Sequence, residues 1–407
     1  MVLFGSENLS HTFTERMKGM RVGIITNNVA RNKNLQSSLE IIRSKVDAKS
    51  FTLLTPEHGY FGDAQAGVAV ESGWNESLKM NVESLYRNPV SGKKLTGKDV
   101  DFDIGEKNSP KDDSKYPSKE TMDELDCIIC DLQDIGCRIY TNMATMIYSM
   151  SVCRDDQEFI VLDRPNPING VSIDGPILKE SLFSFIGTMP IPLRHSLTMG
   201  ELAKFFNEYQ NKNATNLSIV PVKGWKRDMW LDQTGMPWIM PSPNMPSLQS
   251  ANIYPGTGLL SGTNLSEGRG TTLPFQTFGA PFVDGMKLKE QLNEENAGVK
   301  CIDFRFRPTF SKYEGKSCGG IFATITERDR FKPFEFVLSI LSYMISHHDA
   351  EFAFDDTHFD KASGDERIRK MLLDGKSATE IEEHYRTESK TFLEKKQSIE
   401  IYGSPHS

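Results

Sequence analysis

Short apolar segments alternate with helical patterns along the first 225 residues of the chain. Runs of apolar residues predict strands at 21–26, 49–54, 127–130, 159–162 and 217–222. Apolar positions at helical spacing predict helices near 35–42, 140–153 and 198–209. Thr198 and Glu201 form a capping box at the start of the last helix. Strands that alternate with helices favour a mostly parallel sheet, so the sequence predicts an α/β fold with a Rossmann-like domain.

The pattern changes at two places further along the chain. Residues 87–124 are polar and charged, which is typical of a mobile surface insertion. Residues 224–281 are rich in Pro, Gly, Asn and Trp, and we expect them to be irregular but ordered. The spacing beyond them predicts helices at 286–296, 334–346 and 380–396 and strands at 301–306 and 321–326. We therefore predict a Rossmann-like domain over residues 1–247, which includes the insertion, and a smaller α+β domain over residues 248–407.

Composition narrows the classes of protein that the chain can be. The 407 residues include 47 Lys and Arg against 55 Asp and Glu, a formal net charge of −8. An acidic body without a basic patch disfavours nucleic acids, because it repels their phosphates. The most apolar run, 336–345, is about half of the ~20 residues that a membrane span needs. The first residues show no basic start followed by an apolar stretch, so we expect no signal peptide, no membrane partner and a cytoplasmic protein.

Cysteine and histidine spacing argues against a metal site. Six cysteines are too few for a disulfide framework. Cys127 and Cys130 form a C-x-x-C pattern, but residues three apart in a strand point to opposite faces and cannot share a metal ion. No recognised ligand spacing is formed by His58, His195, Asp131 and Asp134. We expect buried, reduced thiols and no metal.

Polar residues follow the carboxyl end of each of the first four predicted strands. These exits are Thr26-Asn27-Asn28, Thr55-Pro-Glu-His-Gly59, Asp131-Leu-Gln-Asp-Ile-Gly136 and Asp163-Arg-Pro-Asn-Pro167. Ligands of open parallel sheets bind at this edge. The first turn lacks the G-x-G-x-x-G pattern and no Walker A sequence occurs, so a nucleotide is unsupported. Four polar exits in succession favour a site for another ligand.

The residue types at these exits suit a neutral or acidic sugar. Hydrolysis of a glycosidic bond needs a protonated acid near the leaving oxygen, commonly with a second carboxylate. Glu57 is the strongest candidate for the acid, and from the residues alone it is equally well a helix cap or an ion-pair partner. Asp131, Asp134 and Asp163 are candidates for the second carboxylate, and each is equally well a turn-forming residue.

A series of longer motifs covers nearly the whole chain in order. Besides the exits above, it comprises Gly23-Ile-Ile-Thr-Asn27, Arg194-His195, Gly224-Trp-Lys-Arg-Asp228, Pro241-Ser-Pro-Asn-Met-Pro246, Gly262-Thr-Asn-Leu-Ser-Glu-Gly-Arg-Gly-Thr271 and Phe310-Ser-Lys-Tyr313. This series resembles the exo-β-N-acetylmuramidase family. The resemblance implies a Rossmann-like N-terminal domain, a smaller C-terminal domain and a cleft between them. It also implies removal of N-acetylmuramic acid (MurNAc) from the non-reducing end of peptidoglycan fragments, without a cofactor.

The resemblance places the family's catalytic glutamate at Glu57. We expect His58 and Asp134 to complete the catalytic set. The residues expected to bind the sugar are Asn27, Arg138, Tyr140, Asp163, Arg164, Asn166, Arg194, His195, Arg227, Asn244, Asn264 and Arg269. Asn142 and Ser261 stand where the family often has an aromatic residue and a glutamate. The alternative is a protein that captures muropeptide sugars without cleaving them.

Overall fold

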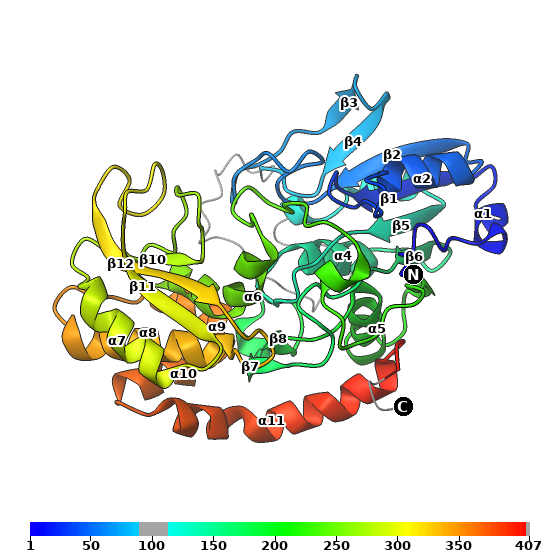
Figure 1. Ribbon diagram of the computed structural model, residues 1–407. Coiled ribbons are helices and arrows are strands. Elements are labelled where there is room, and N and C mark those ends of the chain that lie inside the picture. The colour runs from blue at the N-terminus through cyan, green and yellow to red at the C-terminus, as the bar shows by residue number, and fades with distance from the viewer. Residues whose placement is uncertain (89–112, 404–407) are drawn as a thin grey trace.

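The computed structural model describes residues 1–88 and 113–403, and the main feature of this part is a seven-stranded sheet (Figure 1). The strands lie in the order β3-β4-β2-β1-β5-β6-β9, and neighbours are parallel except β3 and β4. Their bounds are Arg21–Thr26 (β1), Ser50–Thr55 (β2), Gly73–Asn75 (β3), Met80–Ser84 (β4), Cys127–Asp131 (β5), Glu158–Leu162 (β6) and Asn216–Val220 (β9). The predicted mostly parallel sheet is confirmed, and the short β3–β4 hairpin at its edge was not predicted.

Helices cover both faces of this sheet. Helices α4 and α5 pack on one face and α2 on the other, each burying the apolar side of the strands beneath it. Cys127 and Cys130 lie in the hydrophobic clusters on opposite faces, as the strand period predicts. The helices of this half are α1 (His11–Arg16), α2 (Ser38–Lys45), α3 (Lys119–Glu124), α4 (Asn142–Ser151) and α5 (Met199–Tyr209).

The predicted surface insertion at 87–124 is partly packed structure. Residues 89–112 lie outside the described residues. Tyr116 and Met122 are buried in the cluster beneath α4, and α3 leads directly into β5. The prediction was therefore wrong for the segment after residue 112. A few apolar side chains among many charged ones anchor this segment in the core. The prediction rested on the average composition of residues 87–124, which is dominated by the charged side chains.

The second half of the chain is built on an antiparallel sheet with the order β10-β12-β11. The predicted strands and helices of this half are confirmed within a few residues. The confirmed elements are Val299–Phe306 (β11), Cys318–Ile325 (β12), Gly285–Glu295 (α7), Pro333–His347 (α8) and Ala378–Ile399 (α11). The structure adds Thr277–Ala280 (β10), Asp356–Ser363 (α9) and Glu366–Leu373 (α10), to which the sequence analysis assigned no range. In the described ranges, no helix combines the length and the apolar character that crossing a bilayer requires.

Helix α6 (Leu248–Thr257) lies inside the stretch that we expected to be irregular. Pro255 and Gly256 near its end obscure the helical pattern in the sequence. The glycine has a packing role, since a Cβ at Gly256 would lie 2.0 Å from the carbonyl oxygen of Pro333 at the start of α8. The absence of a side chain lets these two helices approach closely.

The two halves share a core and are joined again at the end of the chain. Leu193 of the first half belongs to the same hydrophobic cluster as Phe336 of the second. Helix α11 runs back along the first half (Figure 1), and Tyr402 beyond it contacts Trp225 with ring centroids 5.1 Å apart. A short ribbon of β7 (Asp174–Ile177) and β8 (Pro192–Arg194) lies between the halves. The domain boundary after residue 247 stays a prediction.

Candidate active site

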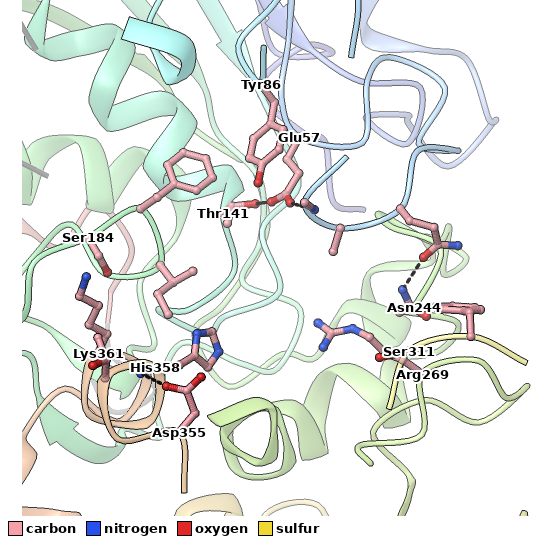
Figure 2. A pocket seen from close by; sticks show the side chains of 17 residues that line it. Glu57, Tyr86, Thr141, Ser184, Asn244, Arg269, Ser311, Asp355, His358 and Lys361 are labelled. Atoms are coloured by element: carbon pink, nitrogen blue, oxygen red, sulfur yellow. Dashed lines mark hydrogen bonds between the residues drawn. The ribbon is translucent and has the colours of Figure 1, made fainter. Parts of the chain in front are cut away.

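A cavity of about 730 Å³ opens where the carboxyl end of β2 faces the second half of the chain (Figure 2). An adjoining cavity of about 160 Å³ shares Glu57, Asn244 and Arg269 with it. The larger volume lies in the range of small-molecule sites. Because both halves supply the lining, the cavity is a site that neither half forms alone.

Glu57 projects into this cavity from the turn that follows β2 (Figure 2). Its Oε1 accepts a hydrogen bond of 2.8 Å from the backbone N–H of Gly67, and its Oε2 accepts one of 2.7 Å from the hydroxyl of Thr141. A backbone N–H can only donate, so Oε1 acts as the acceptor in this contact and the geometry places no proton on it. A hydroxyl can also accept, so Oε2 is the oxygen that can carry one. Glu57 is thus held in place, 7% exposed, with one oxygen able to transfer a proton.

His58 and Tyr140 line the smaller cavity. His58 has a φ of 75°, a left-handed conformation that is uncommon for residues other than glycine and that clusters at functional sites. Its Nδ1 lies 2.7 Å from the carbonyl oxygen of Ala64, which accepts the ring hydrogen. The ring of Tyr140 meets that of Tyr254 edge to face, with centroids 6.4 Å apart. Both predicted residues therefore border the space beside Glu57.

Asn244 closes one side of both cavities. Its Nδ2 donates a hydrogen bond of 2.9 Å to Oε1 of Gln65, in the loop that continues from Glu57 (Figure 2). The predicted Pro241–Pro246 motif is thereby tied to the loop that holds the predicted catalytic residue. Gln65 and Gly67 were missed by the sequence analysis, because a glutamine and a backbone N–H in a loop give no recognisable pattern.

Arg269 points into the cavity from the second half of the chain (Figure 2). Its Nη1 donates to Oε1 of Glu267 at 2.6 Å, and Nζ of Lys312 donates to Oε2 of the same carboxylate at 3.1 Å. Burial raises the pKa of Glu267, but Arg269 and Lys312 outweigh it and bring this pKa to about 2. One carboxylate thus faces two cations, and the guanidinium of Arg269 stands at the cavity wall.

The first turns of α9 form a polar wall that the sequence analysis missed. Asp355, His358 and Lys361 are spaced by three residues and line the cavity together. Nε2 of His358 lies 3.0 Å from Oγ of Ser261, whose hydroxyl donates to the carbonyl of Gly258 at 2.7 Å. Nε2 must therefore carry the hydrogen of that contact. Burial lowers the pKa of His358, so the ring is neutral at pH 7 with Nδ1 as a hydrogen-bond acceptor.

The predicted Asp134 and His195 meet each other rather than the cavity. Oδ2 of Asp134 accepts the N–H of Gly136 at 2.6 Å and lies 3.2 Å from Nε2 of His195. Nδ1 of His195 accepts the N–H of Leu197 at 3.1 Å, so Nε2 carries the hydrogen that Asp134 accepts. This buried pair fixes the turn after β5.

Arg138 is buried at the contact between the two halves. Burial lowers the pKa of its guanidinium to about 10. Its hydrogen bonds go to backbone carbonyl oxygens of Pro176, Ile191, Ala362 and Ser363. The residue therefore joins β7 and β8 to the end of α9.

The other predicted arginines of the first half also lie outside the cavity. Arg164 pairs with Asp131 beneath the sheet edge, and Arg227 pairs with Glu201 at 2.6 Å. Arg194 lines a separate cavity of about 300 Å³ at the contact between the halves. Burial lowers the pKa of Arg194 to about 10.

The predicted Asn27, Asn166 and Asn264 lie in turns away from the cavity lining. Asn27 is buried after β1. Asn166 donates to the carbonyl of Leu197 and accepts from the N–H of Ile168. Asn264 donates from Nδ2 to the carbonyl of Glu351 and accepts the N–H of Ala353 at Oδ1. The part of the chain that the structure describes contains no group of three or more His, Cys, Asp and Glu arranged to hold a metal ion.

Asp163 connects the end of β6 to α5 and to the chain end. It accepts hydrogen bonds from the hydroxyl of Thr198 (2.8 Å), the N–H of Gly200 (2.7 Å) and the hydroxyl of Tyr402 (2.5 Å). Burial raises its pKa to about 6. A raised pKa means that the folded state binds the proton of Asp163 more tightly than the unfolded chain does. Protonated Asp163 therefore contributes fully to the stability of the fold below about pH 4, and this contribution is lost as the pH rises through about 6.

We expect Tyr402→Phe to destabilise the fold, and more strongly at pH 8 than at pH 5. The change removes a hydrogen bond that stabilises the ionised Asp163 and leaves the N–H of Val222 without its 2.8 Å acceptor. The loss should be about 1–3 kcal/mol at pH 8. Chemical denaturation at both pH values measures it, with Tyr209→Phe, at an exposed hydroxyl contact, as the matched control. A loss independent of pH would show that Asp163 is not what the hydroxyl stabilises.

Comparisons with known proteins agree with this architecture. Residues 22–105 and 109–249 match the family model for the N-terminal part of the exo-β-N-acetylmuramidase NamZ, and residues 252–402 match the model for its C-terminal part. The chain is 39% identical over 401 residues to the peptidoglycan β-N-acetylmuramidase NamZ of Bacillus subtilis (strain 168), covering 98% of this chain and 91% of that protein.

Two solved structures from Bacteroides fragilis NCTC 9343 have the same fold. Both are described as DUF1343 family proteins, and each match covers 99% of both chains. The first has a TM-score of 0.83 at 29% identity, and the second has 0.73 at 24%. By the two family models and the Bacillus relative, the chain belongs to the NamZ family of exo-β-N-acetylmuramidases.

Proposed function

We infer that this chain is a glycosidase that releases MurNAc from the non-reducing end of peptidoglycan fragments, with Glu57 as the general acid. Membership of the NamZ family supports the activity. The observation that supports the role of Glu57 is its fixed carboxyl group at the wall of a sugar-sized cavity. Oε2 would give its proton to the glycosidic oxygen as the C1–O bond breaks.

We propose that Arg269 recognises the lactyl carboxylate that distinguishes MurNAc from N-acetylglucosamine (GlcNAc). A guanidinium binds a carboxylate through two parallel N–H groups. Nη1 of Arg269 is engaged by Glu267, whereas its buried Nε has no hydrogen-bond partner among the described residues. Burial lowers the pKa of Arg269, but Glu267 outweighs burial and raises this pKa, so the guanidinium stays charged and favours an anionic group at this place.

Three further predicted residues border the sugar space. We propose that His58, Tyr140 and Asn244 contact the hydroxyl or acetamide groups of the sugar, since each lines a cavity beside Glu57. The other predicted residues would act indirectly, because they hold turns or join the halves. They are Asn27, Asp134, Arg138, Asp163, Arg164, Asn166, Arg194, His195, Arg227 and Asn264.

The decisive experiment is to incubate the protein with the disaccharide MurNAc-β-GlcNAc and to measure free MurNAc. We expect release, whereas a protein that only captures the sugar would bind the disaccharide and leave it intact. A chromogenic β-MurNAc glycoside should be cleaved much faster than its β-GlcNAc analogue. Equal kcat/KM values for the two glycosides would contradict recognition of the lactyl carboxylate by Arg269.

A further inference from the structure

We propose that Asp355 is the second carboxylate of the reaction and acts as the general base on the attacking water. The proposal rests on the assignment of Glu57 as the acid. It adds a residue that lies about 300 positions away in the sequence and belongs to the other half of the chain.

The position of Asp355 distinguishes it from every acidic residue that the strand exits suggested. Of the described carboxylates, those that line the large cavity are Glu57 and Asp355. Figure 2 shows them on opposite sides of this cavity, with Glu57 on the sheet side and Asp355 at the start of α9. Asp131 is paired with Arg164, and Glu267 lies behind Arg269.

The backbone around Asp355 fixes the direction of its side chain. Oδ1 accepts a hydrogen bond of 3.2 Å from the N–H of His358, so that Asp355 is the N-cap of α9. Its own N–H donates to the carbonyl of Gly262 at 2.9 Å. The N-terminus of a helix attracts negative charge, which suits a carboxylate that must be ionised before it takes a proton. The neighbouring ring of His358 is neutral and adds no charge of its own beside Asp355.

The placement of two carboxylates on opposite walls fits single displacement by water. The oxygen of a water molecule forms a bond to C1 of MurNAc while the bond from C1 to the leaving oxygen breaks. Asp355 takes a proton from the water, and Glu57 gives its proton to the leaving oxygen. Exchange with solvent then returns both carboxyl groups to their starting states. One water is consumed, and the configuration at C1 changes from β to α.

The first test is Asp355→Asn, assayed on MurNAc-β-GlcNAc. Asparagine caps a helix about as well as aspartate, so the fold and α9 should persist with an unchanged Tm. We expect kcat to fall by about 10²–10⁴-fold because the base is lost. The matched control is Asp284→Asn at the N-cap of α7, whose carboxylate accepts from the N–H of Met286 at 3.1 Å, and its kcat should be unchanged.

The second test uses Asp355→Ala with sodium azide, an anion that attacks carbon without a base. We expect azide to restore turnover and to yield the α-azide of MurNAc, which a merely structural role of Asp355 would not produce. Nuclear magnetic resonance of the wild-type reaction should show α-MurNAc as the first product. Full activity of Asp355→Asn would overturn the proposal, and β-MurNAc as first product would overturn the role as base. Failure of the wild type to release MurNAc would instead contradict the proposed function.

Discussion

Replacing Glu57 by glutamine is expected to lower kcat on MurNAc-β-GlcNAc by about 10²–10⁴-fold, the usual contribution of a general acid. Glutamine can keep both contacts of the native side chain. Its carbonyl oxygen can accept from the N–H of Gly67, and its amide can donate to the hydroxyl of Thr141. The Tm should therefore hardly change, while the proton that the leaving oxygen needs is lost.

The leaving group separates the role of acid from other roles of Glu57. A nitrophenolate is a stable anion and needs little protonation, so the loss for Glu57→Gln should be smaller on a nitrophenyl glycoside than on the disaccharide. The control is Glu71→Gln, the same chemical change at an exposed position 14 residues further on, and it should keep full activity. An equal loss on both substrates would indicate that Glu57 is a nucleophile, a base or a substrate anchor.

The sequence predicts the sheet of this protein well because its signals are local. Each parallel strand is a short run of apolar residues, and its end is marked by a polar turn. This local pattern also located Glu57, which is the second residue after the end of β2. The same reasoning cannot distinguish a strand end whose polar residues bind a ligand from one whose polar residues form hydrogen bonds inside the fold. Asp163 follows β6 in the same way as Glu57 follows β2, yet it bonds α5 and Tyr402 inside the fold.

The far wall of the cavity depends on how the two halves are packed. Asp355, His358 and Lys361 share one side of α9, and this D-x-x-H-x-x-K spacing is visible in the sequence. Nothing in the spacing says which side of the helix faces a cavity, because that follows from long-range contacts such as those of Arg138. Helix α6 was missed for a related reason, since Gly256 is selected by contact with α8 and weakens the local signal.

Arg269→Gln is expected to remove most of the preference for MurNAc over GlcNAc. Removing one partner of a buried, hydrogen-bonded charge pair costs about 2–5 kcal/mol, which corresponds to a selectivity loss of roughly 30-fold or more. The substitution keeps polar contact with Glu267 but removes the charge and the forked geometry that bind a carboxylate. The kcat/KM for a β-MurNAc glycoside should fall, while that for the β-GlcNAc analogue should change little.

The ratio of the two kcat/KM values is the right measurement, because it does not depend on how much of the variant is folded. This matters since the loss of Arg269 leaves Glu267 with Lys312 as its remaining cation. Arg330→Gln, at an exposed ion pair with Glu327, is the matched control and should keep the wild-type ratio. Arg269→Lys should give an intermediate ratio, because an ammonium keeps the charge without the paired N–H groups. A wild-type ratio in Arg269→Gln would show that another group reads the lactyl carboxylate.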